Sequence, residues 1–159
     1  MSKEVSLLLS CIDIAQYFIW VANETGSFIS NLKLQKLVYY AQAWHIAIHD
    51  SPLFEEDFEA WVHGPVIPSL YRQYKSFGWQ PISEDVMPQL PQNIRQFLDE
   101  VVQEYFDCDG YELEQMTHLE DPWNRAREDL APDEPSNQVI KKEWMKEFYG
   151  ERVEENQKD

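Results

Sequence analysis

Apolar side chains recur at three- and four-residue steps in several stretches of the chain, and this spacing places them on one face of an α-helix. The pattern predicts a mainly α, compact, single-domain fold of about six helices, with a short β element near residues 57–63. The longer helices are expected over residues 7–24, 31–50, 68–77, 92–105, 111–119 and 136–149, with one or two further turns at 123–127.

The stretch from Asn31 to Asp50 is predicted to be the central helix. Its apolar positions cover nearly the whole circumference, and a helix that is apolar nearly all round is usually buried against several neighbours. Ser30 or Asn31 can cap its start, and the sequence Asp-Ser-Pro that ends at Pro52 offers a turn at its end. We therefore expect the other elements to pack around this helix.

Segments that lack helical periodicity come between and after the helices. Phe58, Ala60 and Val62 alternate with their neighbours, which predicts a short strand that ends at Gly64-Pro65. Three prolines between residues 79 and 91 indicate an irregular connection. Residues 151–159 form a polar tail after a glycine and are expected to be disordered, so the domain is expected to span residues 1–150.

Net charge limits the classes of partner. The 159 residues carry a formal net charge of −16, which argues against direct binding to nucleic acid, because phosphate contacts need clustered Lys and Arg. Residues 1–98 hold 10 acids and 6 bases, whereas residues 99–159 hold 19 acids and 7 bases. This acidic C-terminal third is either a solvated surface or one that attracts a basic partner.

The sequence also indicates a cellular location. No apolar run reaches the roughly 20 residues that a membrane span requires, and the N-terminus lacks the pattern of a signal peptide. The two cysteines, Cys11 and Cys108, fit reduced thiols better than a disulfide framework. We therefore expect a cytoplasmic protein with no membrane partner.

The residues that could support catalysis form no recognised motif. His45 and His49 have metal-clamping spacing, but Ile46 stands where the zinc-protease motif needs glutamate. Neither a nucleophile elbow nor a glycine-rich phosphate loop is present. We expect no enzyme, cofactor or metal. A small metal-dependent hydrolase that uses His45, His49, His63 or His118 is the alternative.

Aromatic residues make up 14% of the chain and include six tryptophans. Several stand beside polar residues, and half-exposed Trp, Tyr and Arg commonly anchor protein interfaces. The alternative is that the aromatic rings fill the core. The residues expected to bind a partner are Trp61, His63, Tyr71, Arg72, Trp79, His118, Trp123 and Arg125.

Three blocks resemble a known family in this order: LKLQKLVYYAQAWHIAI from Leu32, PLFEEDFEAWVHGPVIPSLY from Pro52 and LEQMTHLEDPWNRAR from Leu113. Together they resemble the Panacea domain of the SocA-like antitoxins, a family also found in phage-associated proteins, over roughly residues 8–148. The family pattern is matched at Leu34, Gln35, Lys36, Leu37, Glu59, Ala60, Trp61, Gly64, Pro65, Val66, Thr117, His118, Pro122 and Trp123.

The resemblance implies a helical antitoxin that neutralises a toxin encoded nearby by binding it directly. It also implies an alternative, in which the protein is a proteolytic adaptor that delivers the toxin to a ClpXP-type protease. His63 departs from the family pattern, which often has a tyrosine there. We interpret most of the matched positions, including Glu59, Gly64, Pro65 and Pro122, as residues that shape the fold.

Overall fold

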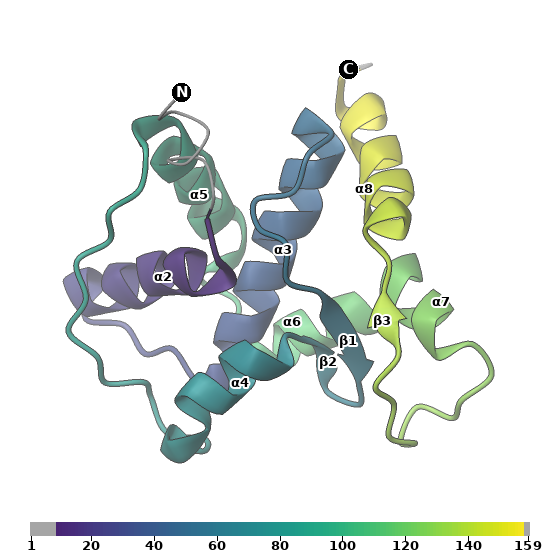
Figure 1. Ribbon diagram of the computed structural model, residues 1–159, viewed down its shortest axis with the longest axis horizontal. Coiled ribbons are helices and arrows are strands. Elements are labelled where there is room, and N and C mark those ends of the chain that lie inside the picture. The colour runs from purple at the N-terminus through teal and green to yellow at the C-terminus, as the bar shows by residue number, and fades with distance from the viewer. Residues whose placement is uncertain (1–8, 158–159) are drawn as a thin grey trace.

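The computed structural model describes residues 9–157 and confirms a mainly α fold (Figure 1). Within this range seven α-helices and one 3-10 turn accompany a small three-stranded sheet. The elements are α2 (Cys11–Thr25), α3 (Asn31–His49), β1 (Phe58–Trp61), β2 (Gly64–Val66), α4 (Pro68–Tyr74), η1 (Lys75–Phe77), α5 (Gln92–Tyr105), α6 (Gly110–His118), α7 (Asp121–Arg127), β3 (Val139–Ile140) and α8 (Lys142–Gln157).

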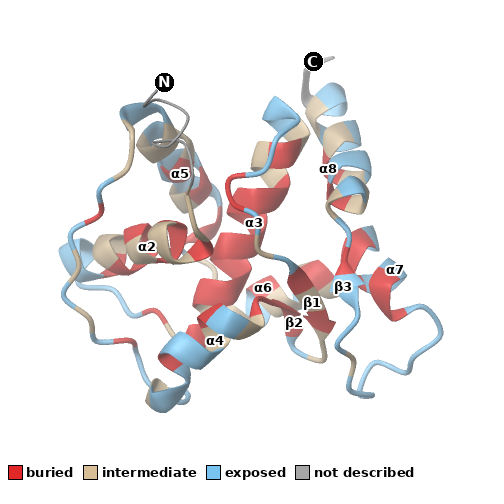
Figure 2. Ribbon diagram, viewed as in Figure 1, coloured by how far each residue is buried: buried red, intermediate tan, exposed pale blue. Residues whose placement is uncertain are grey.

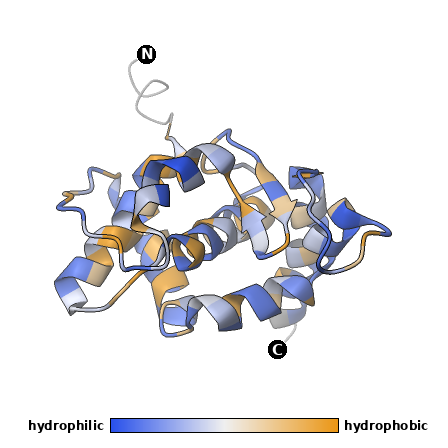
Figure 3. Cartoon of the chain, turned by 90° about the horizontal axis from the view of Figure 1, so that it is seen from below, coloured by the Kyte–Doolittle hydropathy of each residue, from blue (hydrophilic) through white to orange (hydrophobic). Residues whose placement is uncertain are grey.

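Helix α3 runs through the centre of the molecule, as the apolar pattern predicted. Helices α2 and α5 lie on one side of it, and the sheet, α7 and α8 lie on the other (Figure 1). Its first two thirds are buried almost all round (Figure 2). Seen from below and coloured by hydropathy, the surrounding helices carry both hydrophobic and hydrophilic residues, as amphipathic helices do (Figure 3).

Short polar side chains and left-handed residues set the ends of the first two helices. The Ser10 side chain accepts a hydrogen bond from the Asp13 backbone, and the Asp13 carboxylate accepts one in return, which completes a capping box on α2. Gly26 ends α2 at φ 66°. Ser30 caps α3, and Asp50 ends it at φ 55°. The expected limits of the central helix are therefore confirmed.

Two buried glutamines of α3 bind backbone outside the helix. The Gln42 amide donates to Phe54 O at 2.9 Å and accepts from Leu53 N at 2.7 Å. The Gln35 side chain accepts from Ile67 N at 3.0 Å, at the joint between β2 and α4. Buried backbone groups must find partners, so these two side chains fix how the chain enters and leaves the β-hairpin.

The sheet contains more strands than the sequence predicted. Strands β1 and β2 form an antiparallel hairpin in which Trp61 lies opposite Gly64. The distant strand β3 pairs with the other edge of β1, with Ile140 opposite Phe58. The predicted strand is confirmed as β1, but the expected end of that strand at Gly64-Pro65 is in fact the second arm of the hairpin. Strand β3 follows β1 by about 80 residues, so no local sequence pattern indicates that the two strands pair.

The last helix differs from its predicted limits at both ends. It begins at Lys142, because Ile140 is in β3, so Ser136 is not its cap. It then continues past Gly150 to Gln157, so residues 151–157, expected to be disordered, are helical. Glycine weakens a helix interior by only about 1 kcal/mol, which the packing of α8 on α3 can offset.

A half-buried carboxylate connects α3 to α8. Glu120 accepts hydrogen bonds from the hydroxyls of Tyr40 and Tyr149, both at 2.7 Å, and the Tyr149 hydroxyl oxygen lies 3.2 Å from that of Tyr39. Burial raises the pKa of Glu120, and the two tyrosine donors oppose that rise. Glu120 also occupies the N-cap position of α7, but its side chain points to the tyrosines and does not cap the helix.

Candidate functional site: an aromatic groove beside the β-hairpin

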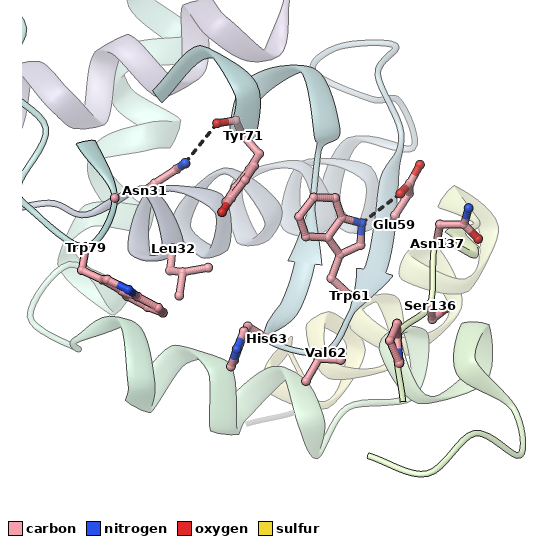
Figure 4. Close-up of a pocket in the computed structure, with 12 residues that line it drawn as sticks. Asn31, Leu32, Glu59, Trp61, Val62, His63, Tyr71, Trp79, Ser136 and Asn137 are labelled. Carbon is pink, nitrogen blue, oxygen red and sulfur yellow. Dashed lines mark hydrogen bonds between the residues drawn. The ribbon is translucent and has the colours of Figure 1, made fainter. Parts of the chain in front are cut away.

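An open groove of about 720 Å³ lies between β1, the end of α4 and the segment that precedes β3 (Figure 4). Three of its lining residues are aromatic, and Glu59 is its one acidic side chain. The residues that line it are Asn31, Leu32, Glu59, Trp61, Val62, His63, Tyr71, Gly78, Trp79, Pro135, Ser136 and Asn137.

Strand geometry places two of these side chains together. Glu59 and Trp61 are two residues apart on β1, so both project from the same face of the strand. The Trp61 indole Nε1–H donates to Glu59 Oε1 at 2.9 Å. The Trp61 ring also meets Tyr71 of α4 edge to face, with 5.2 Å between ring centroids. These contacts restrict the Trp61 ring, while its exposed part faces the groove.

The opposite end of the groove is formed by Trp79. Its side chain is 76% exposed, and Figure 4 shows it beside Leu32. Gly78 precedes it at φ 58°, in the left-handed region that other residues adopt at a cost. The His63 ring stands edge to face with Trp79 at 6.5 Å, and His63 Nδ1 lies 3.2 Å from Glu114 of α6. The hairpin turn therefore connects the groove to α6.

Behind the groove, a fully buried lysine supports the hairpin. Lys36 of α3 is 0% exposed, and its Nζ donates to Pro65 O at 3.4 Å. Burial lowers the pKa of this ammonium to about 7, and the nearby Glu114 opposes that shift. Gly64 leaves room for it: a Cβ there would lie 2.5 Å from Lys36 Cε and 3.1 Å from Thr117 Oγ1. The Lys36 side chain therefore occupies the space beneath β2 that a side chain at position 64 would need.

Side chains of α6 and α7 hold the backbone of β1. The Trp123 indole donates to Trp61 O at 2.8 Å, and the His118 ring stacks on Trp123 with 4.0 Å between centroids. The Arg127 guanidinium donates to Ala60 O at 3.0 Å. His118 Nε2 is buried without a hydrogen-bond partner among the described residues, and burial lowers the pKa of the ring, which favours its neutral form.

We expect Arg127→Met to lower the free energy of unfolding by about 2–3 kcal/mol, because it leaves buried carbonyls without their charged donor. Besides Ala60 O, the guanidinium donates to Ala131 O at 2.9 Å and Glu134 O at 2.6 Å, and the residue is 3% exposed. Urea unfolding would measure the loss. Arg125→Met is the control: that exposed side chain pairs with Glu147 and should change stability by less than about 1 kcal/mol.

The structure brings together only some of the residues expected to bind a partner. Trp61, His63, Tyr71 and Trp79 all line the groove, although they come from three separate segments. Arg72 is exposed on α4 but outside the lining. Four of the eight residues expected to bind a partner therefore share one surface, the groove.

The other three expected residues lie elsewhere. Trp123 is 4% exposed, so in this fold it supports the hairpin and offers almost no surface to a partner. His118 is half-buried beneath it, and Arg125 is exposed on α7, where it pairs with Glu147 of α8. The sequence placed Trp123 beside polar neighbours, but those neighbours did not reveal that its indole is turned inward.

Several lining residues had no signal in the sequence. Glu59 was interpreted as a residue that shapes the fold, yet its carboxylate also faces the groove. The segment 135–137 reaches the groove because β3 pairs with β1, about 75 residues earlier in the chain. The same folding also brings His63 of the hairpin turn to Glu114 on α6, the helix that ends at His118, which no local pattern indicated.

The two histidines with metal-clamping spacing and the buried Cys11 lie on different helices. His45 and His49 are neighbours at 4.6 Å, but His45 Nδ1 contacts Ser51 O at 2.6 Å. Within residues 9–157, no three His, Cys, Asp or Glu side chains come together in a way that could hold a metal ion. Burial, with help from Glu56, raises the pKa of the Cys11 thiol to about 12, which disfavours the nucleophilic thiolate.

None of the helices in the described range is long and apolar enough to cross a membrane.

Comparison with known proteins gives two matches. The family model described as "Antitoxin SocA-like, Panacea domain" matches residues 34–124. The antitoxin SocA of Caulobacter vibrioides (strain NA1000 / CB15N) is 46% identical over 50 residues, which cover 31% of this chain and 27% of that protein. The aligned stretch is therefore less than a third of either protein. No solved structure matches the chain significantly.

Proposed function

The chain belongs to the SocA-like antitoxin family with a Panacea domain, and we propose that it neutralises a cognate toxin by binding it directly through the aromatic groove. The observation that carries the proposal is the exposure of aromatic side chains in one concave surface inside the family-matched segment. Trp61, Tyr71 and Trp79 all fall within residues 34–124.

An exposed tryptophan beside a groove floor that is held in place is well suited to anchor a partner. Interface energy concentrates in a few Trp, Tyr and Arg side chains that fill pockets and lose water on binding. Trp79 is 76% exposed, so nearly its whole ring is free to be covered. The groove floor is fixed beforehand by the hydrogen bonds of Gln35, Trp123 and Arg127 to the backbone of the hairpin. Such preorganisation lowers the entropy lost when a partner binds.

We further propose that neutralisation involves no chemistry by this chain. Two ionisable groups beside the groove serve structural contacts: Lys36 binds Pro65 O, and His63 pairs with Glu114. The toxin would then be inactivated by occlusion, and the gene for it would be expected close to the gene for this protein.

The test is co-expression with the toxin gene next door, followed by growth assays and co-purification. We expect Trp79→Ala to weaken the complex at least about tenfold, or roughly 1.4 kcal/mol, because truncation removes the most exposed anchor of the groove. Its thermal stability should stay close to that of the parent protein, since Trp79 lies outside the core.

Tyr111→Ala is the matched control, because Tyr111 is 69% exposed and lies outside the groove. Its complex should be unchanged. A toxin that remains toxic and never co-purifies would contradict direct neutralisation. A toxin that is bound but whose half-life shortens only when a ClpXP-type protease is present would favour the adaptor alternative.

A further inference from the structure

We propose that the groove recognises a cationic side chain, an arginine or lysine on an extended segment of the toxin, with Glu59 as its counter-ion. This inference deepens the proposed function, because it names the chemistry of the partner at the same groove. It rests on three independent observations: the state of the Glu59 carboxylate, the state of the groove aromatics and the charge of the whole chain.

The Glu59 carboxylate is held in one orientation, but no basic side chain among the described residues pairs with it. One oxygen, Oε1, accepts the Trp61 indole N–H at 2.9 Å, which fixes the side chain at the groove wall. Among the described residues, no lysine, arginine or histidine forms an ion pair with Glu59, and no other donor reaches its carboxylate. A half-buried carboxylate that is held in place in this way offers its second oxygen to an incoming cation.

Within residues 9–157, no lysine or arginine lies over the Trp61, Tyr71 or Trp79 ring. Elsewhere in the described chain cations cover aromatic rings: Arg95 lies over Trp20, Arg127 over Trp123, and both Arg125 and Lys141 over Trp144. None of these contacts involves Trp61, Tyr71 or Trp79. The rings of the groove are therefore available to cover the aliphatic stem of a basic side chain, while Glu59 pairs with its charged end.

The two ends of the groove differ in chemistry. Glu59 and Trp61 lie at one end with Ser136 and Asn137, which add hydroxyl and amide acceptors (Figure 4). Leu32 and Trp79 form the other end, which suits an apolar side chain. An extended segment that carries both a basic and an apolar residue fits this arrangement. The net charge of −16 would steer such a segment toward the protein.

A peptide probe tests this chemistry without any toxin. The heptapeptide acetyl-Ala-Leu-Ala-Ala-Arg-Ala-Ala-amide is compared with the same peptide in which citrulline, a neutral isostere, replaces arginine. We expect the arginine peptide to bind at least tenfold more tightly at low salt. It should shift the indole N–H resonances of Trp61 and Trp79 and leave that of Trp20 unchanged. Equal binding of both peptides, or shifts confined to other tryptophans, would overturn the proposal.

Glu59→Gln separates the groove from the general acidity of the protein. This variant keeps the size of the side chain and an oxygen for the Trp61 indole, and it should lose the preference for arginine over citrulline. Glu143→Gln removes one exposed acid of α8 outside the groove, so it should keep the preference. If Glu59→Gln retained the full preference, the assignment of Glu59 would be wrong.

Glu59→Gln, tested with the toxin and with Glu143→Gln as its control, distinguishes this inference from the proposed function. If the parent protein binds its toxin and Glu59→Gln weakens the complex at least tenfold, both stand. If Glu59→Gln binds as well as the parent protein, the cationic anchor is excluded while direct neutralisation remains. If the parent protein binds no toxin, the proposed function fails, and the peptide measurement still decides the chemistry of the groove.

Discussion

Replacing Gly64 by alanine is expected to lower the free energy of unfolding by about 3–5 kcal/mol, which is the range of severe steric and backbone defects. Gly64 adopts φ +108°, a conformation that L-residues rarely reach, and a Cβ there would lie 2.5 Å from Lys36 Cε. The end of a lysine could normally move aside. Here it cannot, because Lys36 is completely buried. The melting temperature should fall by about 10 °C.

A second glycine provides the control for backbone strain alone. Gly78 also has positive φ, +58°, but a Cβ there would meet nothing within 4 Å. Gly78→Ala should therefore cost only the backbone strain, about 1–3 kcal/mol, because its conformation of φ 58° and ψ −126° is one that L-residues rarely adopt. Combining Gly64→Ala with Lys36→Ala should cost clearly less than the sum of the two single changes, because the second change removes the clashing atoms. Additive losses would mean that Lys36 is not what excludes a side chain at position 64.

Replacing Lys36 by methionine is expected to stabilise the fold at neutral pH and to change how stability depends on pH. Burial lowers the Lys36 pKa from 10.5 to about 7. Each unit of difference is worth about 1.4 kcal/mol, so carrying this lysine costs the fold up to roughly 5 kcal/mol at or below pH 7. Methionine fills a similar volume without a charge. The gain should be about 2–4 kcal/mol, since the hydrogen bond to Pro65 O is lost.

The pH dependence follows from which state holds the proton. Between about pH 7 and 10.5 the unfolded chain keeps Lys36 protonated while the folded chain does not, so stability contributed by this site rises with pH. The gap between Lys36→Met and the parent protein should therefore be largest near pH 7 and narrow toward pH 9.5. Burial raises the pKa values of Cys11 and Tyr17 to about 12, which opposes that rise at high pH, but both proteins share these groups.

Chemical unfolding at pH 6, 7, 8 and 9 measures both effects. Lys146→Met removes an exposed lysine that pairs with Asp50, and its difference from the parent protein should stay small and constant across this range. A Lys36→Met profile parallel to that of the parent protein would show that the buried lysine titrates normally.

Gly64 and Lys36 belong to the support of the groove and lie away from the surface where a toxin would bind. Lys36 and Gly64 set the position of β2, and β2 sets the position of the turn that carries His63. The energetic cost of a buried lysine is consistent with a hairpin that must be held in one position. If the groove is the toxin-binding surface, a variant that loosens this support should weaken the complex even though it changes no residue in contact with the toxin.

Local sequence patterns determined much of this fold. The helical spacing of apolar residues predicted α3 and α5 with nearly correct limits, because each helix buries a face that its own sequence defines. The serine cap of α3 and the proline at the start of α4 mark helix ends for the same local reason. The strand β1 was visible as alternation, and the resemblance to the SocA-like antitoxins rested on residues that can be read in order.

The groove was decided by tertiary structure alone. Glu59, Tyr71 and Asn137 line one groove only after β3 has paired with β1 and α4 has packed beside the hairpin, and the first of these steps joins residues about 80 positions apart in the chain. The same holds for the inward turn of Trp123 and for the continuation of α8 past Gly150. Periodicity specifies which face of an element is buried, whereas the identity of the neighbour across that face depends on the packing of the whole chain.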